Sequence, residues 1–156
     1  MLRPVCIWSS SAPRRSGRAL DHTTRSTMTA IERILTTGES ARSDDAPMPT
    51  DEEFRSAETE LGFRFPDSYR EFVRLGGLGE LRINHRVLSP SEILQSLRYL
   101  PDREHVPFAD NGCGDFYCWP RTEAAEPAVL FADHETGFTY SEAAASFTHW
   151  LEEHRF

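Results

Sequence analysis

The aromatic residues of this chain are distributed so unevenly that they set the limits of any folded domain. All ten phenylalanines, all four tyrosines and two of the three tryptophans lie beyond residue 50. Residues 1–27 are instead rich in serine, threonine, arginine and proline, and such a segment cannot bury enough apolar surface to offset its ordering entropy. We therefore expect residues 1–49 to be a disordered or mis-annotated N-terminal extension and linker, and residues 50–156 to form one domain.

Three interpretations of residues 1–27 remain open. A start codon assigned too early is one, because Met28 opens a more ordinary sequence. The others are a plain disordered tail and a transit peptide, since the segment is arginine-rich, serine-rich and poor in acids. A secretory signal is not expected, because no apolar core of about 7–15 residues follows the first charges. Residues 30–36 have the pattern of a short amphipathic helix.

The charge of the chain is also uneven. The formal net charge is −8, with 17 arginines and 25 acids, yet residues 1–27 hold five arginines and one acid. The remaining residues hold 12 arginines and 24 acids, a net charge of −12. Such a domain is not expected to bind nucleic acid or an anionic membrane, and it would attract a basic protein partner. Three cysteines without a disulfide pattern indicate the cytoplasm.

Capping signals and apolar periodicity predict helices in the first half of the domain. Residues 50–61 begin with a capping box and carry an apolar stripe, and residues 89–100 repeat both features. Residues 66–75 predict a further helix, which starts with proline and ends before a glycine pair. A short hairpin is expected within residues 81–88.

The second half of the domain predicts strands. Aromatic or β-branched runs at 105–109, 115–119 and 128–132 are separated by turn-forming segments, and a further strand is expected at 138–140. A last helix is expected over residues 141–154. Helices first, then strands with tight turns, then a closing helix: this order predicts an α+β fold with helices flanking an antiparallel sheet.

Candidate catalytic and metal-binding groups are few. The sequence has no Gly-x-Ser-x-Gly nucleophile elbow and no phosphate-binding loop, and its two nearby cysteines lack the second ligand pair usual in zinc sites. The glycine-rich segment 110–115 is interpreted as a tight turn between strands. We therefore predict no cofactor, no metal and no enzymatic activity. A metal-dependent hydrolase that uses Asp115, Asp133 and His134 remains an alternative.

Three segments of the domain resemble the SUKH superfamily, the Smi/Knr-type domain of bacterial immunity proteins and fungal cell-wall regulators. They are residues 60–73 (ELGFRFPDSYREFV), 106–117 (VPFADNGCGDFY) and 127–135 (PAVLFADHE), the last followed by 146–151 (SFTHWL). Leu75-Gly76-Gly77 lacks the asparagine that often precedes the family's glycine pair. The resemblance implies an α+β domain without known catalytic activity, which in bacteria typically neutralises a toxin domain, often a nuclease.

The charge of the domain and the resemblance together predict an immunity protein that occludes a basic toxin domain by direct contact. A regulatory scaffold that binds a cellular enzyme is the alternative, as the family's regulatory members imply. Interface anchors are expected to be aromatic residues with acids around them. The predicted partner-binding set is Asp110, Asp115, Tyr117, Trp119 and Asp133.

Overall fold

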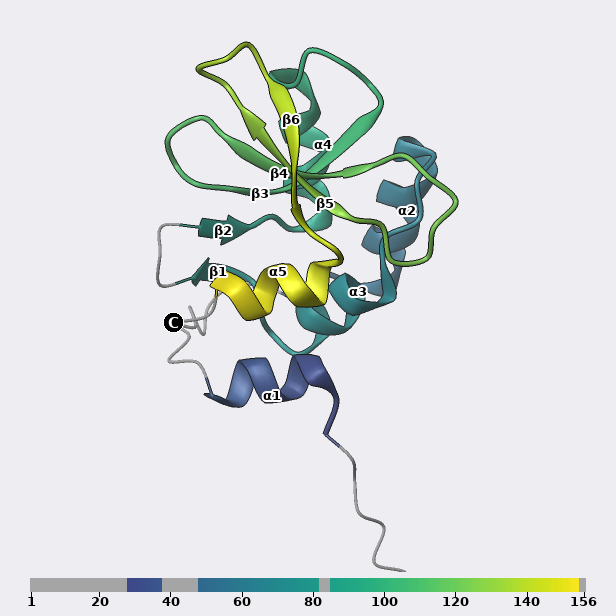
Figure 1. Ribbon diagram of the computed structural model, residues 1–156. Helices are drawn as coiled ribbons and strands as arrows, with labels where there is room; N and C mark the ends of the chain where they lie inside the picture. Colours follow the sequence, from purple (N-terminus) through teal and green to yellow (C-terminus); the bar gives the residue numbers. More distant parts are fainter. Residues whose placement is uncertain (1–27, 38–47, 82–84, 155–156) are drawn as a thin grey trace, which may run out of the picture.

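The computed structural model describes residues 28–37, 48–81 and 85–154, which contain both helices and strands (Figure 1). The helices are α1 (Ala30–Thr37), α2 (Asp51–Leu61), α3 (Asp67–Arg74), α4 (Pro90–Ser96), the 3₁₀-helix η1 (Leu97–Tyr99) and α5 (Phe147–His154). The strands are β1 (Gly79–Leu81), β2 (His85–Val87), β3 (His105–Asp110), β4 (Phe116–Pro120), β5 (Val129–Asp133) and β6 (Thr139–Ala144). No described helix has the length and apolar character that crossing a membrane requires.

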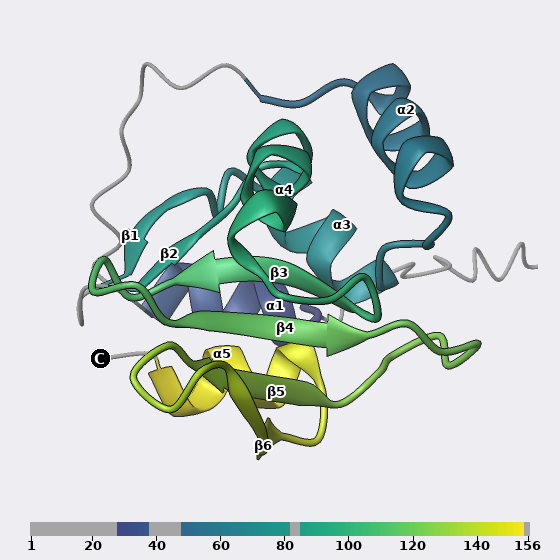
Figure 2. The same cartoon turned by 90° about the horizontal axis from the view of Figure 1, so that it is seen from above.

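The described strands form one antiparallel sheet in which every strand pairs with the next strand of the chain, in the order β1-β2-β3-β4-β5-β6. Tight turns join β3 to β4 and β5 to β6, as antiparallel neighbours allow, whereas α4 and η1 lie in the connection between β2 and β3. Figure 2 shows β3 and β4 side by side, with α4 beside β3 and α5 near β5 and β6. The predicted α+β fold is confirmed. The predicted first hairpin is present as the β1–β2 pair, while its residues 82–84 lie outside the described residues.

The predicted helix starts at residues 50 and 89 are confirmed, because both capping boxes form. The Thr50 hydroxyl oxygen accepts from the Glu53 N–H (3.2 Å), and the Glu53 carboxylate accepts from the Thr50 N–H (2.6 Å). Ser89 and Glu92 form the same reciprocal pair at the start of α4. Gly62 ends α2 at a positive φ of 60°, which glycine adopts without a steric penalty.

The predicted last helix, 141–154, is wrong in its first part. Strand β6 continues to Ala144, and α5 begins only at Phe147. The alanine-rich sequence favours a helix locally, but β5 offers backbone partners along the whole of β6, and Ala144 pairs with Val129. Tertiary pairing therefore overrides local propensity in this segment.

The short helix expected at residues 30–36 is present as α1 and belongs to the main hydrophobic core. Ile31 and Ile34 are almost fully buried, and α1 packs against α3 and α5. The Thr29 hydroxyl donates to the Glu71 carboxylate on α3 (2.5 Å). Figure 1 shows α1 beside α5, although the two helices are far apart in the sequence. The domain is predicted from the sequence to start at residue 50, but α1 precedes that residue and contributes Ile31 and Ile34 to the same core.

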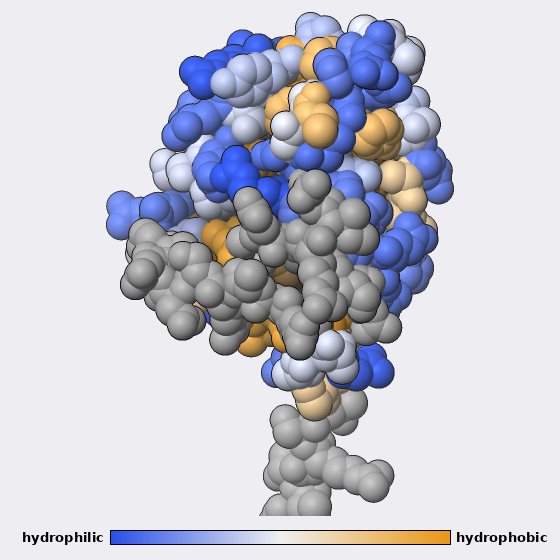
Figure 3. All heavy atoms as spheres, turned by 90° about the vertical axis from the view of Figure 1, so that its left-hand side faces the viewer, coloured by the Kyte–Doolittle hydropathy of each residue, from blue (hydrophilic) through white to orange (hydrophobic). Residues whose placement is uncertain are grey.

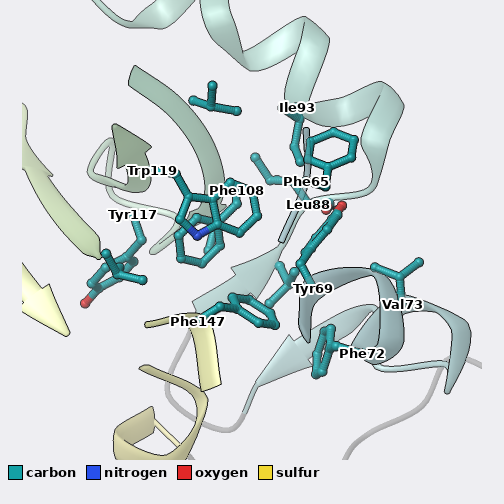
Figure 4. Close-up of a cluster of buried hydrophobic side chains, with 14 of the residues drawn as sticks. Phe65, Tyr69, Phe72, Val73, Leu88, Ile93, Phe108, Tyr117, Trp119 and Phe147 are labelled. Carbon is teal, nitrogen blue, oxygen red and sulfur yellow. Dashed lines mark hydrogen bonds between the residues drawn. The ribbon is translucent and has the colours of Figure 1, made fainter. Parts of the chain in front are cut away.

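The main core lies between the sheet and the helices, and Trp119 of β4 is fully buried within it (Figure 4). Its ring stacks on Phe108 of β3 with centroids 4.3 Å apart, and it meets Tyr69 of α3 edge-on at 5.2 Å. The Tyr69 hydroxyl donates to the Leu88 carbonyl (2.7 Å), so this buried phenol keeps a hydrogen-bond partner. These contacts join α3 to the two central strands.

A smaller hydrophobic cluster lies on the opposite face of the sheet. It consists of Leu100, Phe116, Cys118 and Ala132, with Phe138 and Tyr140 partly buried against it. Successive side chains of a strand point to opposite faces, so Phe116 and Cys118 face this cluster while Tyr117 and Trp119 face the main core. Burial raises the pKa of the Cys118 thiol far above its ordinary value, which keeps the group protonated and unreactive near neutral pH.

The substitution Trp119→Ala is expected to lower the free energy of unfolding by about 3–5 kcal/mol, because it leaves a cavity among packed rings. The matched control is Tyr99→Ala, since Tyr99 is 53% exposed and its loss is expected to cost less than about 1 kcal/mol. Urea unfolding followed by circular dichroism measures both variants. Equal losses for the two would contradict a core position for Trp119.

Candidate partner-binding surface

The turn between β3 and β4 is held by side chains that bond to its own backbone. Asn111 Oδ1 accepts from the Asp115 N–H (3.2 Å), and Asp110 Oδ1 accepts from the Gly112 N–H (3.1 Å). Gly112 and Gly114 have φ angles of 72° and 105°, which residues with a Cβ rarely adopt. The glycine-rich segment is therefore the tight turn that the sequence predicts.

Asp115 and His134 join this turn to the turn between β5 and β6. Asp115 Oδ1 accepts from the His134 backbone N–H (3.0 Å) and lies 2.6 Å from His134 Nδ1. Asn111 Nδ2 donates to Asp115 Oδ2 (2.7 Å), so both carboxylate oxygens are engaged. The two turns consequently form one continuous surface at one end of the sheet. We call residues 110–115 and 133–138 the hairpin-end surface.

The Asp115–His134 pair shifts the pKa of both side chains. The hydrogen bond to Asp115 raises the pKa of His134 above its ordinary 6.5, with a smaller contribution from the surrounding negative charges. Partial burial raises the pKa of Asp115, but the hydrogen bonds from His134 and Asn111 together outweigh it and hold that pKa below the ordinary 3.8. At mildly acidic pH the pair is therefore an imidazolium beside a carboxylate.

The turn between β5 and β6 holds Phe138 in an unusual backbone conformation. Asp133 Oδ1 accepts from the Glu135 N–H (2.8 Å), and the Asp133 carbonyl accepts from the Phe138 N–H (2.7 Å). Phe138 has a φ of 62°, and among the described residues it is the one non-glycine residue with a positive φ. Holding a bulky residue there costs roughly 1–3 kcal/mol, which the surrounding hydrogen bonds and packing must offset.

The three aspartates of the hairpin-end surface differ in their partners. Arg86 of β2 donates to Asp110 Oδ2 (3.2 Å) and also to Glu92 of α4, so the charge of Asp110 is partly neutralised within the chain. Asp115 is paired with His134. The Asp133 carboxylate lies next to the exposed Glu135. It accepts a hydrogen bond from the Glu135 backbone N–H. Asp133 and Glu135 are therefore the carboxylates most open to a cationic partner.

Aromatic residues border the acidic turns. Tyr99 at the end of η1 is largely exposed, and its ring stacks on Phe116, the residue after Asp115, with centroids 6.2 Å apart and planes at 16°. Phe138 is half-buried against the cluster that contains Phe116. Figure 3 shows the side of the molecule toward which the turns project in Figure 1, where small hydrophobic areas lie among hydrophilic residues. These rings thus lie with the smaller cluster, on the face of the sheet that carries Phe116 and Ala132.

The structure brings three of the five predicted contact residues together and places the other two elsewhere. Asp110, Asp115 and Asp133 lie on the hairpin-end surface. Trp119 is fully buried in the core, which corrects the prediction that its ring contacts a partner. Tyr117 is 8% exposed and faces α5, and its hydroxyl lies 3.3 Å from His154 Nε2. Alternation along β4 thus removes both aromatic anchors from the predicted set.

Two aromatic residues of this region are not singled out by the sequence analysis. Tyr99 lies outside the apolar stripe of the helix predicted over residues 89–100. This position could have indicated from the sequence that its side chain is exposed. Phe138 directly follows Gly137 in a turn, where a bulky side chain is unexpected. Its backbone conformation comes only from the structure, because no local pattern predicts a positive φ for phenylalanine.

Among the described residues, Asp115, Asp133 and His134 are grouped closely enough to share a metal ion, with one potential ligand atom of each within 4.8 Å of the others. This is the set on which the alternative hydrolase depends. Its atoms also make the hydrogen bonds that hold the two turns, from His134 to Asp115 and from Glu135 to Asp133. The arrangement can attract either a metal ion or a cationic group of a partner.

Comparison with known proteins decides the family. The SMI1 / KNR4 family (SUKH-1) matches residues 48–153, which include the whole hairpin-end surface. The chain belongs to this family. The chain has the same fold as a protein from Pseudomonas syringae pv. tomato whose crystal structure is known, with a TM-score of 0.56 and 17% sequence identity. The match covers 81% of the present chain and 96% of the Pseudomonas chain. No curated protein matches the sequence significantly. The resemblance to the SUKH superfamily is confirmed.

The pKa shifts of Asp115 and His134 predict a range of pH in which this pair stabilises the folded protein. Because the His134 pKa is raised in the folded protein, the contribution of His134 to stability is complete below about pH 6.5 and is lost as the pH rises through the folded pKa. Because the Asp115 pKa is lowered, its contribution is complete above about pH 3.8 and is lost as the pH falls through the folded pKa. The stabilisation is therefore complete between these two values.

A nuclear magnetic resonance titration of His134 measures this coupling. The midpoint is expected above 6.5 in the wild-type chain and closer to 6.5 in Asp115→Asn, which keeps the side-chain shape without the charge. The control is Glu60→Gln on α2, which removes a distant exposed carboxylate and should leave the midpoint unchanged. An unchanged midpoint in Asp115→Asn would show that the pair is not coupled in solution.

Proposed function

We propose that this SUKH-1 protein is a non-enzymatic immunity protein that neutralises a basic toxin domain, a nuclease in the first instance, by binding it through the hairpin-end surface. Membership of the SUKH-1 family supports a function of the SUKH type. The observation that carries the finer proposal is the grouping of Asp110, Asp115, Asp133 and Glu135 on two turns that the Asp115–His134 pair joins.

Charge supports a basic partner. Beyond residue 27 the chain has a net charge of −12, and the carboxylates of the hairpin-end surface concentrate part of it at one end of the sheet. Long-range attraction steers an acidic inhibitor onto a basic cleft and raises the association rate, while close contacts set the dissociation rate. A nuclease cleft is commonly basic because it binds phosphates, so it complements this surface.

Rigidity supports binding by preformed contacts. The two turns are tied to each other by the Asp115–His134 pair and to their own backbones by Asn111 and Asp133. A surface that is already ordered loses less conformational entropy when a partner binds, and this loss otherwise reduces affinity. The arrangement is therefore suited to recognition of a folded partner.

The thiols support a cytoplasmic, non-catalytic protein. Cys113 is exposed and unbonded at the tip of the β3–β4 turn, which suits a reducing compartment. Cys118 is buried with a raised pKa and is therefore a poor nucleophile.

A metal-dependent hydrolase is the second candidate, because Asp115, Asp133 and His134 offer three potential ligand atoms in close proximity. Elemental analysis of the purified full chain, before and after incubation with zinc or manganese salts, tests this candidate directly. A stoichiometric metal that Asp133→Asn removes would favour the hydrolase over the immunity protein. Metal content at background level in both samples would favour the immunity protein.

An affinity pull-down from the native host with the full chain is the test of the immunity function, with mass spectrometry of the proteins that stay bound in moderate salt. The expected result is one basic protein with a toxin-like domain, whose toxicity in a test strain is suppressed when this chain is expressed with it. A bound housekeeping enzyme would instead favour the regulatory scaffold. A basic partner that remains fully toxic would contradict neutralisation.

Substitutions on the hairpin-end surface test where that partner binds. The double variant Asp133→Asn and Glu135→Gln keeps the acceptor that Asp133 provides in the turn but removes two charges, and it is expected to slow association with the basic partner by about tenfold at low salt. The control is Glu60→Gln with Glu52→Gln on α2, which Figure 1 shows across the molecule from the turns. Stopped-flow or surface plasmon resonance measures the rates. Equal slowing in both double variants would point to a general charge effect and contradict this binding site.

A further inference from the structure

Strand β6 is an open edge of the sheet. It is the last strand in the order of the sheet, and Figure 2 shows no helix or strand of the described residues beyond it. Within the described part of the chain, the backbone of β6 makes hydrogen bonds only to β5. Alternate residues of an antiparallel strand direct their N–H and C=O groups away from the paired strand, so part of the β6 backbone faces outward. Such an edge is a template on which another strand can pair.

This edge lacks most of the features by which proteins block the pairing of edge strands. Those features are a very short strand, positively charged residues, proline, a bulge and a covering helix or loop. Strand β6 has six residues without a proline or an arginine, and its one charged residue is Glu142. Strand β1 at the opposite edge has only three residues. The register shifts at Ala143, which the pairing with β5 leaves out, so the regular part of the open edge is 139–142.

Tyr140 holds the middle of this edge strand in place. Its hydroxyl donates to the Asp102 carboxylate (2.7 Å), and its ring stacks on His105 of β3 with centroids 3.7 Å apart and planes at 14°. Asp102 also lies 2.8 Å from His105 Nδ1. Strand β6 is thus fastened to β3, although β4 and β5 lie between them in the sheet. An edge that is already ordered loses little conformational entropy when a further strand pairs with it.

The part of the chain that forms this edge is one-sided in its charge. Between Arg121 and Arg155 the sequence has seven acids and no arginine or lysine, and this stretch includes β5, β6 and α5. The open edge also follows directly after the turn of the hairpin-end surface. A second copy of the chain would bring the same negative charges to the edge, which disfavours pairing between copies. A basic segment of another protein complements this charge.

We propose that β6 is the docking edge for an extended, basic segment of the partner protein, which adds to the sheet as a further strand beside residues 139–142. The backbone groups of the segment pair with the outward-facing groups of β6, and its basic side chains lie near Glu142 and the hairpin-end surface. The inference rests on the proposed function for the existence of a basic partner. It adds the secondary structure that the partner must present, and a contact made by backbone atoms, which side-chain chemistry alone does not provide.

The test is a titration of the isotope-labelled full chain with blocked hexapeptides, monitored by nuclear magnetic resonance. The probes are alternating arginine-valine, the same peptide N-methylated at every residue, and alternating glutamate-valine, at equal ionic strength. The arginine peptide is expected to shift the amide signals of residues 139–142 and to slow hydrogen exchange at alternate residues among them. Its apparent Kd is expected to be about tenfold lower than those of the other two peptides, which lack the backbone donors or the complementary charge.

The variant Glu142→Arg makes the result specific to β6. Glu142 is exposed, so the chain is expected to stay folded, and the new positive charge on the edge repels a basic strand. The apparent Kd for the arginine peptide should rise about 5- to 10-fold. The matched control is Glu60→Arg on α2, which makes the same change in net charge at an exposed position far from β6 (Figure 2) and should change that Kd less than about 2-fold. The unfolding midpoint of each variant is measured alongside.

Three outcomes overturn the inference. They are equal affinity for the arginine peptide and its N-methylated form, absence of any signal shift at residues 139–142, and a dimer in sedimentation velocity whose amides at 139–142 are protected without peptide. The last outcome would assign the edge to a second copy of the chain. The inference and the proposed function fail separately. A neutralised toxin combined with equal peptide affinities would retain the function and remove the docking edge. Binding of the arginine peptide at β6 without any basic partner in the pull-down would do the reverse.

Discussion

The packing of Trp119 against Phe108 and Tyr69 is the interaction on which the rest of the structure depends. It joins the two central strands to α3, and the alternation of β4 then determines where the neighbouring side chains lie. Because Trp119 and Tyr117 face the helices, Phe116 and Cys118 must face the other side, where they build the second cluster. Phe138 packs against that cluster, and Tyr99 stacks on its Phe116. The positions of these two rings therefore follow from the core on the other face of the sheet.

Much of the fold could be predicted from the sequence because its signals are local. Capping boxes at Thr50 and Ser89, and the glycine-rich turn at 110–115, need only neighbouring residues to form, and each has the predicted structure. The error at residues 141–144 has a different origin. Alanine favours a helix when it is considered alone, but here a strand already in place offers hydrogen bonds along its edge. Pairing with the neighbouring strand β5 decides this case, and helix propensity, which considers each residue alone, does not include it.

The candidate surface could be predicted only in part, for a similar reason. Acids in turns are visible in the sequence, and Asp110, Asp115 and Asp133 lie in the two turns that meet. Which aromatic residues accompany them depends on which face of β4 is covered by helices, and this is a tertiary property. Trp119 and Tyr117 lie in the core because helices cover their face of β4, while Tyr99 and Phe138 contact the smaller cluster on the other face. The contact between His134 and Asp115 likewise joins residues from separate hairpins.

Helix α1 lies outside the residues that match the SUKH-1 family, yet Ile31 and Ile34 are buried against α3 and α5. A protein shortened to the family boundary would keep every residue of the family match and both clamped turns. It would also uncover the apolar surfaces of α3 and α5 that the two isoleucines now shield from water. Exposed apolar patches of this kind promote self-association. Helix α1 is therefore expected to reduce self-association of the protein at high concentration, independently of what the acidic turns bind.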